Sequence, residues 1–304
     1  VKLHNTPAEP KSILSKNRKE LIDQSAYCTV VGKLAYYTQK IMVEGINASR
    51  ELCKHLQNPG VDHWQAIKYM AGYLKQEKGK ITVTYQKPKD LRFIGMVDAN
   101  YATNVDDRKS VLGLIFTLGG TIIGWTCKTQ KTTTLSSTEA EYVAISAANQ
   151  ELLFVQNLMK EMGMALMPGI LFNNNKGAIA LVKNRQVSQR TKHIDVCHHF
   201  IRDTWEGGAM DIRFVGTENN EADICTKNLD GTSHIRIQEA IRLGTLGVWI
   251  NHAKLLASLP WREDVNKRDR DAVLYVQVHE ADDYNDSDEI GGKFLFQKRM
   301  KISW

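Results

Sequence analysis

The chain has 304 residues, of which 42% are hydrophobic and 24% are charged, and its formal net charge at pH 7 is +6. This length suits two domains or one large one, and the apolar fraction allows an ordinary buried core. Apolar runs fall short of the roughly 18 residues that a transmembrane helix needs, so we expect no membrane partner. The positive charge is compatible with a nucleic-acid partner but does not require one.

The cysteines indicate a reducing environment. They are odd in number and scattered, and none forms a CxxC pair or a zinc-binding spacing, so we expect buried thiols and an intracellular location. The first 20 residues are polar and basic, unlike a signal peptide. The chain begins with Val1, as a mature organellar protein also would, so nucleus, cytoplasm and organelle all stay open. The five cysteines are Cys28, Cys53, Cys127, Cys197 and Cys225.

The first part of the chain is predicted to be helical. Residues 1–19 are basic and contain two prolines, which favours an extended arm. Residues 22–76 have a helical period, broken by Asn58-Pro59-Gly60. A short strand at 80–85 follows. We therefore expect a small helical domain over residues 1–86.

From residue 91 the pattern changes to strands that alternate with helices, and Gly119-Gly120 indicates a hairpin turn. This order predicts an α/β domain over residues 87–230, with a mixed five-stranded sheet and flanking helices. The expected strands are 92–98, 111–118, 120–127, 169–174 and 211–215, and the expected helices are 136–162, 176–183, 195–206 and 221–227.

Residues 231–304 are predicted to form a C-terminal extension of unknown role, which other proteins could contact. A helix is expected at 235–250 and a strand at 272–278. The segment 280–289 is acidic and typical of a loop. Residues 293–304 alternate loosely, and we expect them to pair with the preceding strand.

Three acids stand where an α/β sheet gathers functional groups. Asp98 ends the first strand of the sheet, Glu141 lies in the first turns of the long helix, and Asp223 begins the last helix. Carboxylates gathered at one sheet edge bind Mg²⁺, and two such ions can activate water against a phosphodiester.

Each acid also has a purely structural interpretation. Glu141 could complete a capping box that begins at Thr138, and Ser136 with Glu139 forms a second candidate box. Asp223 could favour the positive end of a helix dipole, and Asp98 could cap a turn. Spacing alone leaves these interpretations open.

Four sequence blocks stand out, namely Val97–Ala102 with Asp107–Ser110, Leu135–Tyr142, Arg190–Val196 and Glu221–Lys227. They resemble the ribonuclease H region of copia-type retrotransposon polyproteins. The blocks are similar to "SDADWA…DRRS", "LSSTEAEY", "RTKHIDV" and "ADILTK" of that family, and they occur in the same order. A weaker resemblance extends upstream, to the segment that joins the reverse transcriptase palm to ribonuclease H.

The resemblance covers about residues 5–230 and implies the C-terminal region of such a polyprotein, with a connection remnant before the nuclease. The YxDD turn of the polymerase palm does not occur in the sequence, so we expect no polymerase activity from this chain. The family implies a ribonuclease H fold that cleaves the RNA strand of RNA–DNA hybrids with two Mg²⁺ ions. These ions are held by an Asp-Glu-Asp-Asp set.

Carried over to this chain, the set implies Asp98, Glu141 rather than Glu139, and Asp223 as metal ligands. The third acid of the set aligns with Asn174, and no acid lies within several residues of it. An amide offers one neutral oxygen where a carboxylate offers two charged ones. We expect a rate loss on the order of a thousandfold or more.

Three explanations of Asn174 stay open. The element has decayed and the fold serves a new purpose, the asparagine was introduced to trap substrate, or the site works weakly with help from a nearby acid. The first predicts a nucleic-acid-binding or structural subunit of a ribonucleoprotein. The alternative is an active, Mg²⁺-dependent ribonuclease H within a copia-type polyprotein.

Basic side chains near the expected site edge predict contacts with the phosphates of RNA or an RNA–DNA hybrid. A solvated basic face is the structural alternative. The candidates are Lys128, Lys131, Arg190, Lys192 and His193.

Overall fold

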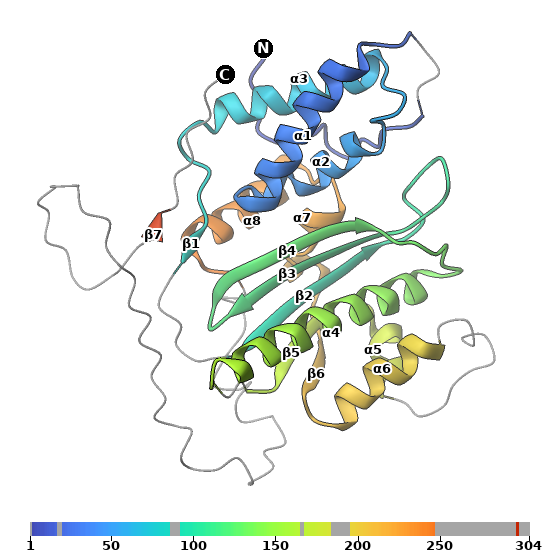
Figure 1. Ribbon diagram of the computed structural model, residues 1–304, viewed down its shortest axis with the longest axis vertical. Coiled ribbons are helices and arrows are strands. Elements are labelled where there is room, and N and C mark those ends of the chain that lie inside the picture. Colours follow the sequence, from blue (N-terminus) through green and yellow to red (C-terminus); the bar gives the residue numbers. More distant parts are fainter. Residues whose placement is uncertain are drawn as a thin grey trace, which may run out of the picture.

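The computed structural model describes residues 2–16, 20–85, 92–164, 167–183, 195–246 and 296–297, with side chains of 195–198 and 296–297 excepted (Figure 1). Three residues predicted to contact nucleic acid, Arg190, Lys192 and His193, lie outside this part of the chain. So do the predicted strand 272–278 and the acidic segment 280–289.

The N-terminal part is helical, as predicted. Asp23 caps its first helix by accepting from the backbone N–H of Ser25, and the third helix begins directly after Pro59 and Gly60. The helices share a core that contains Tyr27, Leu52 and Met70. The elements are α1 (Gln24–Lys40), the 3₁₀ helix η1 (Val43–Gly45), α2 (Ile46–Cys53) and α3 (Val61–Gln76).

The predicted mixed five-stranded sheet is confirmed, with the order β4-β3-β2-β5-β6. Strands β2, β3 and β4 are antiparallel, whereas β5 pairs in parallel with both β2 and β6. The sheet strands are β2 (Phe93–Asn100), β3 (Val111–Leu118), β4 (Thr121–Thr129), β5 (Gly169–Asn173) and β6 (Met210–Phe214).

A separate two-stranded pairing joins β1 (Thr84–Tyr85) to β7 (Phe296–Gln297) in antiparallel fashion. The sequence favoured pairing of residues 293–304 with the strand at 272–278. The described residues of that end pair instead with a strand that precedes the main sheet in the chain.

Helices cover both faces of the sheet (Figure 1). Helices α4 (Ser137–Glu161), α5 (Lys176–Lys183) and α6 (Asp195–Glu206) lie on the face to which β2 turns Val97. On the other face, which receives Met96, lie α7 (Asp223–Thr226), α8 (Gly231–Leu243) and η1. Neighbouring strand residues thus enter different cores, because side chains alternate across a strand. The element η3 (Thr217–Asn219) connects β6 to α7.

The predicted helix at 235–250 begins earlier and ends earlier than expected. Asp230 caps α8 by accepting from the backbone N–H groups of Thr232 and Ser233. Gly244 ends α8 in the left-handed conformation, with a φ of 65°. Ile237 and Ile241 of α8 are buried in the same core as Met96, so the start of the predicted extension packs on the sheet. The three domain boundaries stay predictions.

Within the described part of the chain, no helix combines the length and apolar character needed to cross a membrane.

Candidate carboxylate site at the ends of the central strands

The structure brings Asp98, Glu141 and Asp223 together at one edge of the sheet, and we call these three residues the carboxylate site. Asp98 lies near the end of β2, Glu141 in the second turn of α4, and Asp223 at the first residue of α7. All three are buried, with exposed fractions of 1%, 5% and 9%. The charge of Asp98 acts on both other carboxylates. Buried acids in such proximity need donors or cations to stabilise them.

Hydrogen bonds at the start of α4 engage Glu139 and leave Glu141 for the site. Ser136 accepts a hydrogen bond from the Glu139 backbone N–H at 3.1 Å. The Glu139 carboxylate accepts from the Leu135 N–H at 2.7 Å. Glu141 instead accepts from the side chain of Asn173 at 2.8 Å. Ser136 is therefore the N-cap of α4, as one of the two structural interpretations expected, but the Glu139 carboxylate bonds the residue before the cap and not Ser136 itself.

Lys227 is a site residue that the sequence prediction missed. Its Nζ lies 2.7 Å from Asp223 Oδ1 and 3.3 Å from Asp98 Oδ2. The hydroxyl of Thr226 also donates to Asp98 Oδ2. A signal was present in the sequence, because Lys227 follows Asp223 by four residues, the spacing of neighbours on a helix surface.

Asn173 is a second residue that was missed. Its side chain is fully buried, and Nδ2 donates to Glu141 at 2.8 Å and to the Val97 carbonyl at 3.2 Å. Its Oδ1 accepts from the backbone N–H of Asn175 at 2.9 Å. These three hydrogen bonds determine the orientation of the amide, because a flipped amide would point oxygen at two acceptors. The side chain therefore presents N–H groups, not oxygen, to Glu141.

Asn174, the next residue along the chain, does not share the contact of Asn173 with Glu141. The parallel register pairs Val97 with Asn173, so Asn174 follows at the level of Asp98. Its side chain is half-buried, and Nδ2 lies 3.4 Å from Thr217 Oγ1. Among the contacts of the described residues, Asn173 and not Asn174 touches a site carboxylate. The equivalence of Asn174 to the third acid of the family rests on alignment and stays a prediction.

Asn175 has a structural task, because its Oδ1 accepts from the Ala178 N–H at 2.9 Å at the start of α5. The three consecutive asparagines thus serve three purposes: a buried bridge, a polar contact to η3 and a helix cap. The sequence presented them as one polar patch.

Crowding changes the acidity of the site. Burial, followed by the charge of Asp98, raises the pKa of Glu141 from 4.5 to about 8. The same two causes raise the pKa of Asp223 from 3.8 to about 7, although Lys227 acts in the opposite direction. Burial opposes the charge of Lys227, but Asp98 and Asp223 outweigh it and raise its pKa. A further positive charge would stabilise the ionised carboxylates.

The donor set suits Mg²⁺ in kind but not in arrangement. Carboxylate oxygens are the ligands that Mg²⁺ prefers. Here the ammonium of Lys227 bridges Asp98 and Asp223, and Asn173 directs an N–H group at Glu141. Among the side chains described, no group of three or more His, Cys, Asp or Glu is placed to hold a metal ion. The present arrangement does not fit the expected two-ion site.

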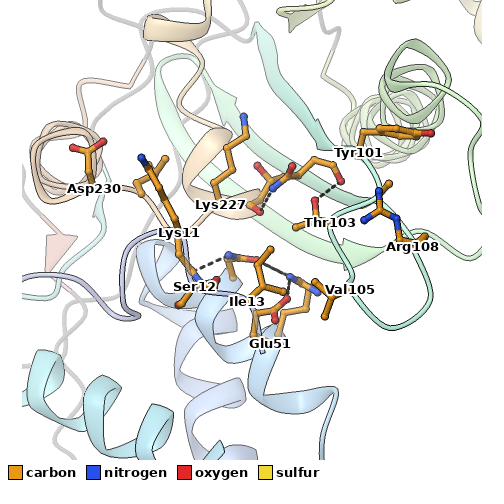
Figure 2. Close-up of a pocket in the computed structure, with 17 residues that line it drawn as sticks. Lys11, Ser12, Ile13, Glu51, Tyr101, Thr103, Val105, Arg108, Lys227 and Asp230 are labelled. Atoms are coloured by element: carbon orange, nitrogen blue, oxygen red, sulfur yellow. Dashed lines mark hydrogen bonds and ion pairs between the residues drawn. The ribbon is translucent and has the colours of Figure 1, made fainter. Parts of the chain in front are cut away.

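A cavity of about 570 Å³ adjoins the carboxylate site (Figure 2). It lies between the N-terminal segment, α2 and the loop after β2, and Lys227 forms part of its wall. Lys11, Arg50 and Arg108 add positive charge to the lining, although Arg50 is held by an ion pair with Glu51. Sequence reasoning did not indicate this cavity, because its walls come from segments far apart in the chain.

The predicted nucleic-acid contacts can be placed only in part. Lys128, in β4, and Lys131, just after it, are both exposed to solvent. Their role in binding stays a prediction.

Comparison with known proteins supplies relatives but no matching family model. Among solved structures, a ribonuclease H1 (LC11) isolated from compost by a metagenomic approach is 13% identical, with a TM-score of 0.36. The alignment covers 44% of this chain and 92% of that protein.

The sequence relatives are retrotransposon polyproteins. The chain is 33% identical over 201 residues to the retrovirus-related Pol polyprotein from transposon TNT 1-94 of Nicotiana tabacum, an alignment that covers 66% of this chain. It is 34% identical over 223 residues to the Pol polyprotein from transposon RE2 of Arabidopsis thaliana, which covers 72% of this chain. The chain spans only 15% of the length of each of these relatives. This chain therefore belongs to the family of copia-type retrotransposon Pol polyproteins.

Proposed function

We propose that this protein is a retrotransposon-derived ribonuclease H-fold protein that binds RNA or RNA–DNA hybrid and has an impaired nuclease site. In this proposal it acts as a binding or structural subunit of a ribonucleoprotein. The observation that supports it best is the end of β5. There Asn173 and Asn174 stand beside the carboxylate site, and no acid occupies either position.

The chemical argument concerns charge. A two-ion phosphodiesterase stabilises the attacking and leaving oxygens through metal ions that need several anionic ligands. An asparagine removes one negative charge and offers a single neutral oxygen. In Asn173 even that oxygen is engaged by the backbone of Asn175. The fold survives because asparagine and aspartate are nearly equal in size.

The binding part of the proposal rests on positive charge near the site. Lys128 and Lys131 are exposed, and Lys11 and Arg108 line the cavity next to the carboxylate site. Lysine and arginine side chains bind phosphates and release counter-ions, so the affinity should fall as salt rises. The proposed setting is a reducing compartment, since Cys28, Cys53, Cys127 and Cys225 carry free thiols.

A working ribonuclease H is the second candidate, and one observation favours it. Three acids of the family set remain, and burial, followed by the charge of Asp98, raises the pKa of Glu141 to about 8 and that of Asp223 to about 7. Groups whose pKa is displaced by burial and like charge gather at functional sites. Under this candidate, bound cations would relieve the repulsion.

The decisive experiment compares cleavage with binding. The purified chain is incubated with labelled RNA–DNA hybrid and Mg²⁺ as wild type, Asn174→Asp and Asn173→Asp. Hybrid binding is measured separately by fluorescence anisotropy in EDTA, at two salt concentrations. We expect salt-sensitive binding for all three, no measurable cleavage by wild type, and a gain on the order of a thousandfold for Asn174→Asp.

The two asparagines serve as controls for each other. Asn173→Asp places a carboxylate against Glu141 and should restore no cleavage. Adding Asp98→Asn to the Asn174→Asp variant should remove the regained activity. Wild-type cleavage at the rate of an ordinary ribonuclease H would overturn the proposal, and absence of hybrid binding would remove its nucleic-acid part.

A further inference from the structure

The cation within the carboxylate site belongs to the chain itself. Lys227 Nζ lies between Asp98 and Asp223, at 3.3 Å and 2.7 Å from their nearest carboxylate oxygens. The two acids come from different elements, β2 and α7, whose residues are more than a hundred positions apart in the sequence. Together with the Thr226 hydroxyl, which donates to Asp98, Lys227 therefore joins the last helical turn of the site to the central strand.

This ion pair differs from a surface salt bridge. The side chain of Asp98 is 1% exposed and that of Asp223 is 12% exposed, whereas Lys227 keeps 32% of its side chain in contact with solvent. Buried carboxylates lose their hydration and depend on a partner, so removing that partner is costly. The ammonium thus carries out the charge compensation that a metal ion would otherwise provide.

We propose that Lys227 is a resident counter-ion that holds Asp98 and Asp223 together in the metal-free protein and weakens the binding of divalent cations there. The inference concerns the same site as the proposed function. It does not depend on nucleic-acid binding, because it describes the site without substrate.

The geometry explains why the lysine and a divalent ion compete. A cation that used the facing oxygens of Asp98 and Asp223 would lie within a few ångströms of the ammonium. At that distance like charges repel strongly, even at the effective dielectric constant of a protein surface. Divalent-ion binding therefore requires the ammonium to leave.

A cavity next to the carboxylate site offers space beside Lys227. Lys227 is among the residues that line the cavity of about 570 Å³ beside the site (Figure 2). Asp230, which caps α8, lines the same cavity.

The test measures Mn²⁺ binding to the full chain without nucleic acid, by electron paramagnetic resonance of the free ion. Wild type is compared with Lys227→Gln, Lys227→Ala and Lys227→Arg, and with Lys109→Ala as a matched control. Lys109 also pairs with an acid, Asp107, but on the surface. We expect the two neutral variants to bind Mn²⁺ on the order of tenfold more tightly than wild type. Lys227→Arg and Lys109→Ala should match wild type.

Thermal unfolding gives a second measurement that separates a counter-ion from a merely packed lysine. In EDTA, Lys227→Gln should melt below wild type, and Mn²⁺ should restore its Tm while leaving the wild-type Tm nearly unchanged. Circular dichroism checks that each variant is folded. If Lys227→Ala does not fold, Lys227→Gln alone serves as the neutral variant.

Equal Mn²⁺ affinity in wild type and the neutral variants would overturn the inference. Low-micromolar Mn²⁺ binding by wild type would do so without any variant. Neither result depends on the hybrid assays, so failure of the proposed function and failure of this inference remain distinguishable.

Discussion

Two buried polar clusters in this molecule differ in how their carboxylates are balanced by partner groups. The first, which we call the docking cluster, consists of Glu44, Tyr73, His234, Gln238 and Arg242. There Tyr73 and Gln238 both donate to the carboxylate of Glu44, and Arg242 lies 3.8 Å from Glu44 and 2.6 Å from Glu77. In the carboxylate site, three acids share one lysine.

The difference distinguishes a cluster that packing explains from the proposed functional site. In the docking cluster, hydrogen bonds between neutral side chains and Glu44 attach α8 to η1 and α3. Stability and packing account for it. The carboxylate site keeps more negative charge than its partners balance, which costs stability. A buried excess of like charge is typical of a site retained for binding or catalysis.

The largest expected effect comes from disrupting the packing of α8, the helix that the docking cluster holds in place. Ile237 of α8 is 1% exposed and belongs to the core behind the sheet. Ile237→Ala should lower the free energy of unfolding by about 3 kcal/mol, because it removes buried methyl groups and leaves a cavity. Urea denaturation measures this loss.

Ile235→Ala is the matched control, because Ile235 lies on the same helix and is 40% exposed. Its loss should stay below about 1 kcal/mol. Equal losses for the two variants would mean that α8 is not docked as described.

A smaller effect tests the carboxylate site, through the pH dependence of the stability of the protein. The pKa of Glu141 is raised to about 8 in the folded protein, so its proton is held more tightly in the folded than in the unfolded state. In the metal-free wild type, the protonated Glu141 should make its full contribution to the free energy of unfolding below about pH 4.5. That contribution should disappear as the pH rises through 8.

Glu141→Gln removes this titration. At pH 9 the variant should gain on the order of 2 kcal/mol over wild type relative to their difference at pH 5, since one pKa unit corresponds to about 1.4 kcal/mol and the acids titrate together. Denaturation in EDTA at both pH values measures it. The control is Glu139→Gln, two residues earlier in α4; an equal gain for this variant would place the pH effect outside the carboxylate site.

The smallest effect tests the scaffold that presents the site. Ser136 caps α4 through the Glu139 backbone N–H. Ser136→Ala should cost about 1 kcal/mol of stability, the usual value for a lost helix cap. Hybrid binding should be unchanged, because the cap does not touch the site.

Ser137→Ala provides the control on the same turn, since Ser137 is exposed and lies inside the helix. If Ser137→Ala cost as much as Ser136→Ala in thermal denaturation, the capping assignment would be contradicted.

Much of the architecture could be predicted from the chain alone. Alternating and helical periods identified the five strands of the sheet and the long helix, because each element buries one face and the pattern records which residues are buried. Turn residues such as Gly119-Gly120 marked the hairpin. The position of α8 was less well predicted, since its limits depend on the cap residues Asp230 and Gly244 and not on its apolar period.

The sequence by itself determined the order of the elements, the family and the three acids that meet at the sheet edge. The tertiary structure alone decided which partners those acids have. Lys227 reaches Asp98 across 129 positions of chain, and Asn173, not its neighbour Asn174, contacts Glu141. Periodicity records burial within one element, whereas polar pairing depends on the register and packing between elements distant in sequence.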